Sequence, residues 1–208
     1  AGHSDYAFLL ESVEGGEHLG RYSFLGKDPF LILRAGASGR ATIERAGVTS
    51  ELDEPFIDVL RQTMADFKAP VVPDLPRFTG GAVGFVGYDA IPWFESVPLA
   101  PAAPGTDVGD LAGFMVFDTV LAFDHVRHRI LIIANARVGP DADLGALYQF
   151  ACARIEFVER ELQASLSAPE AARGGPLQAA SNTSRDRFEA AVSRAREYIA
   201  AGDIYQVV

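Results

Sequence analysis

Two long apolar runs, residues 113–124 and 129–136, constrain the fold of this sequence most strongly. Both are rich in valine, isoleucine and phenylalanine, and only a short polar link, residues 124–128, separates them. β-Branched and aromatic residues favour strands, and runs this apolar are typical of strands that are buried in a sheet. The two runs therefore predict an antiparallel pair of neighbouring strands.

Shorter strand candidates precede this pair. The first quarter of the chain alternates between short apolar runs and turn-forming residues, as strands and turns do. The runs are residues 6–10, 22–25, 30–34, 41–45 and 48–52. Ala46 and Gly47 separate the last two and predict a hairpin turn. Residues 55–67 have their apolar side chains at helical spacing and predict a helix.

Two further helices are predicted after the long strands. Residues 141–165 have apolar side chains on one face, which indicates an amphipathic helix. That face consists of Leu144, Leu147, Tyr148, Ala151, Ile155, Val158 and Leu162. Residues 185–201 predict a second helix, which Thr183 or Ser184 can cap and Gly202 can end. Its expected buried stripe consists of Phe188, Val192, Ala195 and Ile199.

The order of strands and helices predicts an α+β fold, with antiparallel sheets in a two-sheet sandwich and flanking helices. Residues 166–181 lack periodicity and predict a linker between a region over residues 1–165 and another over residues 182–208. Residues 204–208 look like the start of a buried strand. A strand without a neighbour exposes an unpaired edge, so we expect the sandwich to be incomplete at its C-terminus and the chain to be truncated.

Composition excludes some classes of protein. The net charge is −10, from 28 acidic and 18 basic residues, and no basic stripe suits nucleic acid. The single cysteine, Cys152, cannot form an intrachain disulfide and is interpreted as a small buried apolar residue. No apolar run reaches the roughly 18–20 residues of a membrane span, and residues 1–6 lack signal-peptide features. We therefore expect a cytoplasmic protein.

Residue types alone indicate little chemistry. The glycines of residues 80–87 match neither common phosphate-binding pattern, and a strand with close backbone packing or a bulge explains them better. His125 and His128 have no third metal ligand at a suitable spacing, so an exposed turn explains them better.

Four segments, taken together and in order, resemble the anthranilate synthase large-subunit family of chorismate-utilising enzymes. They are FLLESVEGGE with GRYSFLG (residues 8–17 and 20–26), GGAVGFVGYD (80–89), FDTVLAFDH (117–125), and residues 188–208, which end in IAAGDIYQVV. The resemblance implies a lyase that converts chorismate to anthranilate and pyruvate in tryptophan biosynthesis. It also implies Mg²⁺ as cofactor, a glutamine amidotransferase subunit as partner, and allosteric feedback inhibition by L-tryptophan.

The resemblance assigns two groups of site residues. LLES matches one wall of the family's tryptophan pocket, which points to Ser12 for direct contact, with Glu11 and Leu10 beside it. The neighbouring family segment adds Arg21, Tyr22 and Ser23. From the residues alone, a strand end whose serine caps a turn explains Ser12 better.

Gln206 is the one candidate catalytic residue. Isochorismate- and salicylate-forming relatives resemble this segment but have a lysine here, which acts as a general base for water. Ammonia has its own lone pair and needs no such base, so a glutamine favours an aminating enzyme. Gln206 can also be read as a polar residue that ends a strand.

No segment matches the family's Mg²⁺ carboxylates, so this chain is expected to contain no metal ligands and to be inactive alone. Two alternatives stay open. One is a fragment of aminodeoxychorismate synthase component I, and the other is a non-enzymatic amino-acid-binding regulatory domain. The pattern from Glu11 to Phe24 favours anthranilate synthase, although Ile91-Pro92 replaces the Val-Arg expected after Asp89.

Overall fold

Antiparallel strands form two sheets in this computed structural model, which describes residues 5–11, 20–97, 99, 109–164 and 179–208. The four-stranded sheet has the order β1 (Ala7–Leu10), β2 (Tyr22–Lys27), β8 (Thr119–Asp124) and β9 (Arg129–Ala134). The five-stranded sheet has the order β5 (Val48–Pro55), β4 (Arg40–Arg45), β3 (Leu31–Ala35), β7 (Ala112–Phe117) and β6 (Gly81–Val86). The helical elements are α2 (Phe56–Ala65), the 3₁₀ helix η1 (Tyr88–Trp93), α3 (Leu144–Gln163) and α4 (Arg185–Ala201). The predicted α+β class is confirmed.

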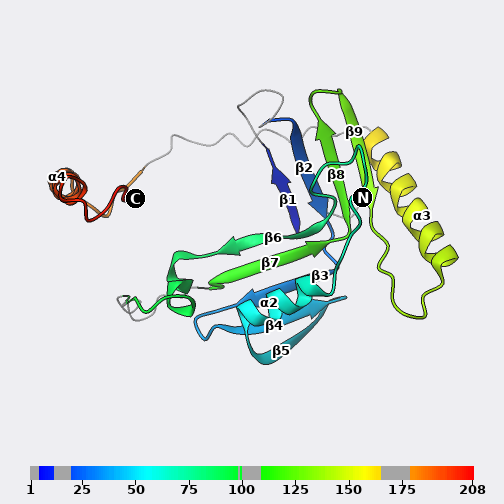
Figure 1. Ribbon diagram of the computed structural model, residues 1–208, viewed down its shortest axis with the longest axis horizontal. Coiled ribbons are helices and arrows are strands. Elements are labelled where there is room, and N and C mark those ends of the chain that lie inside the picture. The colour runs from blue at the N-terminus through cyan, green and yellow to red at the C-terminus, as the bar shows by residue number, and fades with distance from the viewer. Residues whose placement is uncertain (1–4, 12–19, 98, 100–108, 165–178) are drawn as a thin grey trace. The chain divides into compact units, whose positions relative to one another are not determined.

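The chain divides into two units, Ala1–Ala164 and Ser165–Val208, and each is described by itself. Both sheets lie in the first unit, and Figure 1 shows that their strands run across one another. The predicted linker, residues 166–181, lies mostly outside the described residues.

The antiparallel pairing of the two long apolar runs is confirmed for β8 and β9, which pair from Thr119↔Ala134 to Asp124↔Arg129. The prediction that residues 113–124 form one strand is wrong. They form β7 and β8, which belong to different sheets. The division falls at Asp118, whose carbonyl oxygen accepts hydrogen bonds from Asn135 N at 2.7 Å and from Asn135 Nδ2 at 3.1 Å. Both strands are apolar, so the pattern of apolar residues did not reveal the change of sheet.

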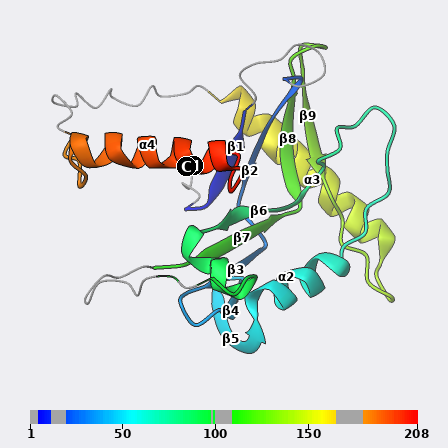
Figure 2. The same ribbon diagram turned by 60° about the vertical axis from the view of Figure 1, so that its left-hand side comes forward.

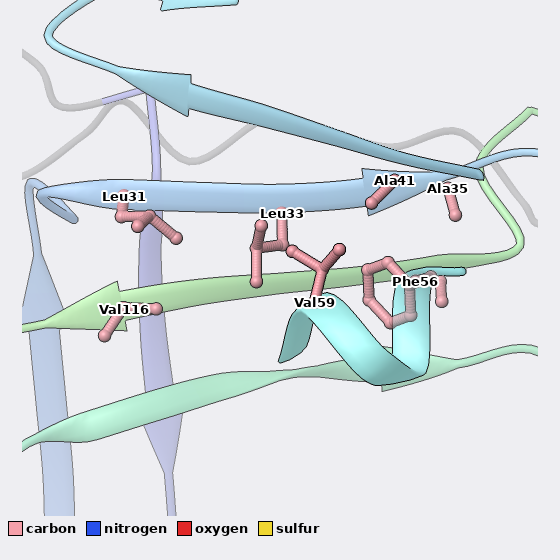
Figure 3. Packing of buried hydrophobic residues seen from close by; sticks show 8 residues of the cluster. Leu31, Leu33, Ala35, Ala41, Phe56, Val59 and Val116 are labelled. Carbon is pink, nitrogen blue, oxygen red and sulfur yellow. The ribbon is translucent and has the colours of Figure 1, made fainter. Parts of the chain in front are cut away.

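One core lies between α2 and the five-stranded sheet. Figure 3 shows Phe56 and Val59 of α2 directed toward Leu33 of β3 and Ala41 of β4. Phe56 is 1% exposed, and burial of such a side chain contributes about 1.5–3 kcal/mol. The predicted hairpin before α2 is confirmed, because Ala46 and Gly47 both have positive φ between β4 and β5.

A second core joins the two sheets. Phe8 of β1 packs edge-on against Phe117 of β7, with their ring centroids 4.8 Å apart, and also contacts Phe78. Val120, Ala122 and Ile133 of the four-stranded sheet complete the buried cluster. Both sheets contribute side chains to this core, which therefore holds them together.

The close backbone packing predicted for the glycines of residues 80–87 is confirmed at Gly84. A Cβ on Gly84 of β6 would lie 2.0 Å from the carbonyl oxygen of Gly113 in β7. Only glycine allows β6 and β7 to approach this closely.

The buried faces predicted for the two long helices are wider than those observed. On α3, which lies against β9, Leu144, Tyr148 and Leu162 are 63%, 71% and 44% exposed, and Cys152 is half-buried instead of buried. Asp143 caps this helix by accepting from Ala146 N at 3.1 Å. The sheet covers a narrower stripe of α3 than the apolar pattern indicated, because its contacts are mainly with β9, with Lys27 of β2 adding an ion pair to Glu161 at 2.6 Å.

α4 has the predicted bounds, with the predicted cap at Ser184 and the predicted end at Gly202, whose φ is 83°. Its predicted stripe is nevertheless exposed, with Phe188 at 63% and Val192 at 45%. Residues 204–208 form no strand, contrary to prediction. A strand needs a hydrogen-bonded neighbour, and the described part of the second unit supplies none.

Candidate effector site

Five of the six residues predicted to bind tryptophan lie at one end of the β1–β2 pair. Leu10 ends β1 and is paired with Phe24 of β2. Glu11 follows directly, while Arg21 precedes β2 and Tyr22 begins it. Figures 1 and 2 show β1 and β2 side by side. Ser12, the sixth, lies outside the described residues.

The pairing register assigns these side chains to two faces of the sheet. Side chains alternate along a strand, so Leu10 shares a face with Tyr22 and Phe24, while Ser23 points the other way. Leu10 is 46% exposed, whereas Ser23 is only 5% exposed. The accessible part of the predicted site is therefore the face that contains Leu10 and Tyr22.

Arg21 is bound tightly to Asp124 at the end of β8. Its Nε donates to Oδ1 at 3.0 Å, and its Nη2 donates to Oδ2 at 2.8 Å. The Asp124 side chain is fully buried, while that of Arg21 is 31% exposed. Two-point contacts between a guanidinium and a carboxylate are among the stronger hydrogen-bonded pairs in proteins.

The surroundings of Asp124 favour its charged form. The hydrogen bonds from Arg21 hold the pKa of this carboxyl well below its usual range, although burial opposes the shift. Arg127 N also donates to Oδ1 at 3.2 Å, and Arg129 Nε lies 3.6 Å from Oδ2. The same contact with Asp124 raises the pKa of Arg21.

His125 makes a second connection beside this ion pair. Its Nε2 and the Ser23 hydroxyl oxygen are 2.7 Å apart and share a hydrogen bond. Its backbone N donates to the carbonyl oxygen of Arg21 at 2.9 Å. Sequence reasoning interpreted His125 as part of an exposed turn and missed both contacts. The available signal was the position of Asp124 and His125 in the family-like segment 117–125.

The other candidate, Gln206, lies in the second unit. It is exposed and follows the end of α4 at Gly202. Its predicted role stays a prediction.

The described residues contain no group of three His, Cys, Asp or Glu side chains that could hold a metal ion. Hollows of about 270 Å³ beside α3 and about 370 Å³ beside the end of α2 are not lined by any predicted site residue. No helix in this part of the chain is long and apolar enough to cross a membrane.

Residues 7–208 match the family model of the chorismate binding enzymes. The chain belongs to this family. It is 37% identical to anthranilate synthase component 1 of Acetivibrio thermocellus, with 99% of this chain and 42% of the relative aligned. Identity to anthranilate synthase component 1 of Synechocystis sp. is 38%, with 98% of this chain and 42% of the relative aligned.

A comparison with a solved structure agrees with these sequence relatives. Anthranilate synthase component I from Streptococcus pneumoniae TIGR4 matches with a TM-score of 0.62 at 26% identity, over 97% of this chain and 42% of that one. This member of the chorismate binding enzyme family therefore spans about two fifths of the length of these relatives. The predicted family resemblance is confirmed.

Proposed function

We propose that this chain is the N-terminal part of an anthranilate synthase large subunit, a cytoplasmic lyase of tryptophan biosynthesis. The observation that supports it best is the match over residues 7–208 to the chorismate binding enzymes, together with relatives named anthranilate synthase component 1. The reaction takes chorismate and ammonia to anthranilate and pyruvate. A glutamine amidotransferase subunit supplies the ammonia.

In this proposal the region of Leu10, Glu11, Ser12 and Tyr22 forms one wall of a feedback site for L-tryptophan. Its support is the LLES and GRYSF resemblance, together with the position of the described residues at one end of the β1–β2 pair. The Ser12 hydroxyl would bond to a polar group of the effector. The exposed Leu10 side chain would contact the indole ring.

Gln206 has a distinct role in the proposal. An amide can orient ammonia as nucleophile but cannot remove a proton from water, so the site favours amination over hydroxylation. The family's Mg²⁺ would balance the charge of the substrate carboxylate. The described residues offer no ligand group for this ion, and in the proposal its ligands belong to another part of the enzyme.

Product analysis with the polypeptide that the complete gene encodes tests this function. Incubation with chorismate, Mg²⁺ and ammonium should give anthranilate, detected by its fluorescence, and an equal amount of pyruvate. The 208-residue chain under the same conditions should give neither product. Aminodeoxychorismate in place of anthranilate would reassign the enzyme, and turnover by the 208-residue chain would contradict the expected division of the active site.

A further inference from the structure

Two adjacent residues at the end of β8 hold the start of β2 in place. Asp124 binds the Arg21 guanidinium through two hydrogen bonds, and His125 binds the Ser23 hydroxyl and the Arg21 carbonyl oxygen. These contacts join β2 to the β8–β9 hairpin just where the predicted effector residues gather. We call Asp124 and His125 the β8 clamp.

The clamp already uses the polar atoms that Arg21 and Ser23 would offer to a ligand. Arg21 points two of its nitrogens at Asp124, and the Ser23 side chain is buried with its hydroxyl bonded to His125. Release of Arg21 would leave the buried Asp124 carboxylate without two hydrogen bonds, and release of His125 would leave the buried Ser23 hydroxyl without its partner, which is costly in each case. Arg21 and Ser23 are thus better suited to fix the wall of the site than to contact an effector.

Asp124 is the centre of this arrangement. Besides Arg21, it accepts from Arg127 N, and Arg129 Nε lies 3.6 Å away. Among the described residues, Arg129 Nε is the buried side-chain nitrogen that lacks a hydrogen-bond partner, so the attraction of Asp124 is its main compensation. Loss of the Asp124 charge would leave the guanidinium groups of Arg21 and Arg129 without the carboxylate that both contact, and would loosen the start of β2.

We propose that Asp124 and His125 are positioning residues of the effector site. Through Arg21 and Ser23 they set where β2 begins, and hence the position of Tyr22, which lies two residues before Phe24, the partner of Leu10 at the end of β1. This inference rests on the proposed function, because the effector is taken to be L-tryptophan. Arg21 and Ser23 then anchor the start of β2 and are not ligands of the effector.

The test measures tryptophan inhibition of anthranilate formation by the polypeptide of the complete gene, relative to the uninhibited rate of each variant. Asp124→Asn and His125→Ala should raise the inhibition constant at least about fivefold, which corresponds to about 1 kcal/mol of lost effector binding. His125→Gln, which can still donate to the Ser23 hydroxyl, should restore most of the inhibition. The KM for chorismate should stay within about twofold of the parent value, a change of under about 0.5 kcal/mol.

Two controls separate positioning from general loss of stability. Glu44→Gln breaks the half-buried pair of Arg34 and Glu44, 2.9 Å apart in the five-stranded sheet, and should leave the inhibition constant unchanged. Ser23→Ala combined with His125→Ala should weaken inhibition no more than His125→Ala alone, because both changes remove the same hydrogen bond.

The outcomes are distinct. A parent enzyme that makes anthranilate but does not respond to tryptophan would remove the effector assignment and the clamp's role with it. If tryptophan inhibits the parent and both variants, His125→Ala and Asp124→Asn, equally well, the positioning role of the β8 clamp is wrong and the proposed function stands. If Asp124→Asn does not fold, the exposed His125 decides the question, since its replacement leaves the core intact.

Discussion

At the scale of single residues, the buried aspartates at the two ends of β8 have different structural roles. Asp118, just before the strand, turns the chain from one sheet to the other and forms an ion pair with Arg154 at 3.5 Å. Asp124, at the other end, binds Arg21 and anchors β2. Each lies in an apolar run and combines a distant arginine with a nearby donor, which is Thr119 Oγ1 at 3.0 Å for Asp118 and Arg127 N at 3.2 Å for Asp124.

Asp124 should make the stability of the chain depend on pH in the acidic range. Because its pKa in the folded state lies below the ordinary value of about 3.9, its stabilising contribution is fully present above that value. The contribution decreases as the pH falls below about 4, toward the lowered pKa of the folded state. Urea unfolding between pH 7 and pH 3 measures this effect.

Asp124→Asn removes the titrating group and serves as the comparison. The variant should be less stable than the parent at pH 7, and the difference should shrink as the pH is lowered to 3. If the difference in free energy of unfolding between parent and variant stayed constant from pH 7 to pH 3, the ion pair with Arg21 would not favour the charged carboxylate.

At the scale of elements, close backbone packing decides how β6 joins its sheet. β6 is an edge strand with β7 as its neighbour in the five-stranded sheet. A Cβ on Gly84 would meet backbone atoms of Gly113 and Phe114 at 2.0 and 2.6 Å. Backbone atoms cannot rotate away as a flexible side chain can, so the two strands would have to separate.

Gly84→Ala should therefore lower the free energy of unfolding by about 1–3 kcal/mol, the usual range for overpacking. Gly139→Ala is the matched control, because a Cβ there has open space around it, and it should change stability by no more than about 0.5 kcal/mol. Chemical denaturation of the 208-residue chain compares the two. Equal midpoints for both variants would contradict the tight β6–β7 contact.

At the scale of the whole molecule, the first unit depends on the places where the chain passes between the sheets. It leaves β2 of the four-stranded sheet for β3 of the five-stranded sheet, and it returns from β7 to β8 at Asp118. Asn135, just after β9, supports the return. Its Nδ2 donates to Thr79 O at 2.7 Å and to Asp118 O at 3.1 Å.

Asn135→Ala should destabilise the first unit by about 1–3 kcal/mol, because the partly buried Thr79 carbonyl loses its donor and the Asp118 carbonyl keeps only the backbone donor. Asn182→Ala, at an exposed position, should have little effect. Thermal or urea unfolding distinguishes them. If Asn135→Ala unfolded at the same midpoint as the parent chain, the core of Phe8 and Phe117 alone would hold the two sheets together.

Local sequence patterns determined many of the helices and turns of this protein. Helical spacing with a capping serine and a final glycine predicted α4 from Arg185 to Ala201, and alternating runs around Ala46 and Gly47 predicted the β4–β5 hairpin. These features depend on residues within a few positions of one another, so the sequence contains the information directly. The family-like segments likewise indicated the end of the β1–β2 pair as the candidate site.

The tertiary structure alone decided which side chains meet. Arg21 and Asp124 are separated by 103 positions, and Ser23 and His125 by 102, so no local pattern relates them. Contacts between distant segments also explain why the run 113–124 is divided between two sheets. The same holds for the exposed stripes of α3 and α4. Apolar spacing reports which residues share a face, but which neighbour covers that face, and which buried charge finds a partner there, depends on contacts that form only when distant segments pack together.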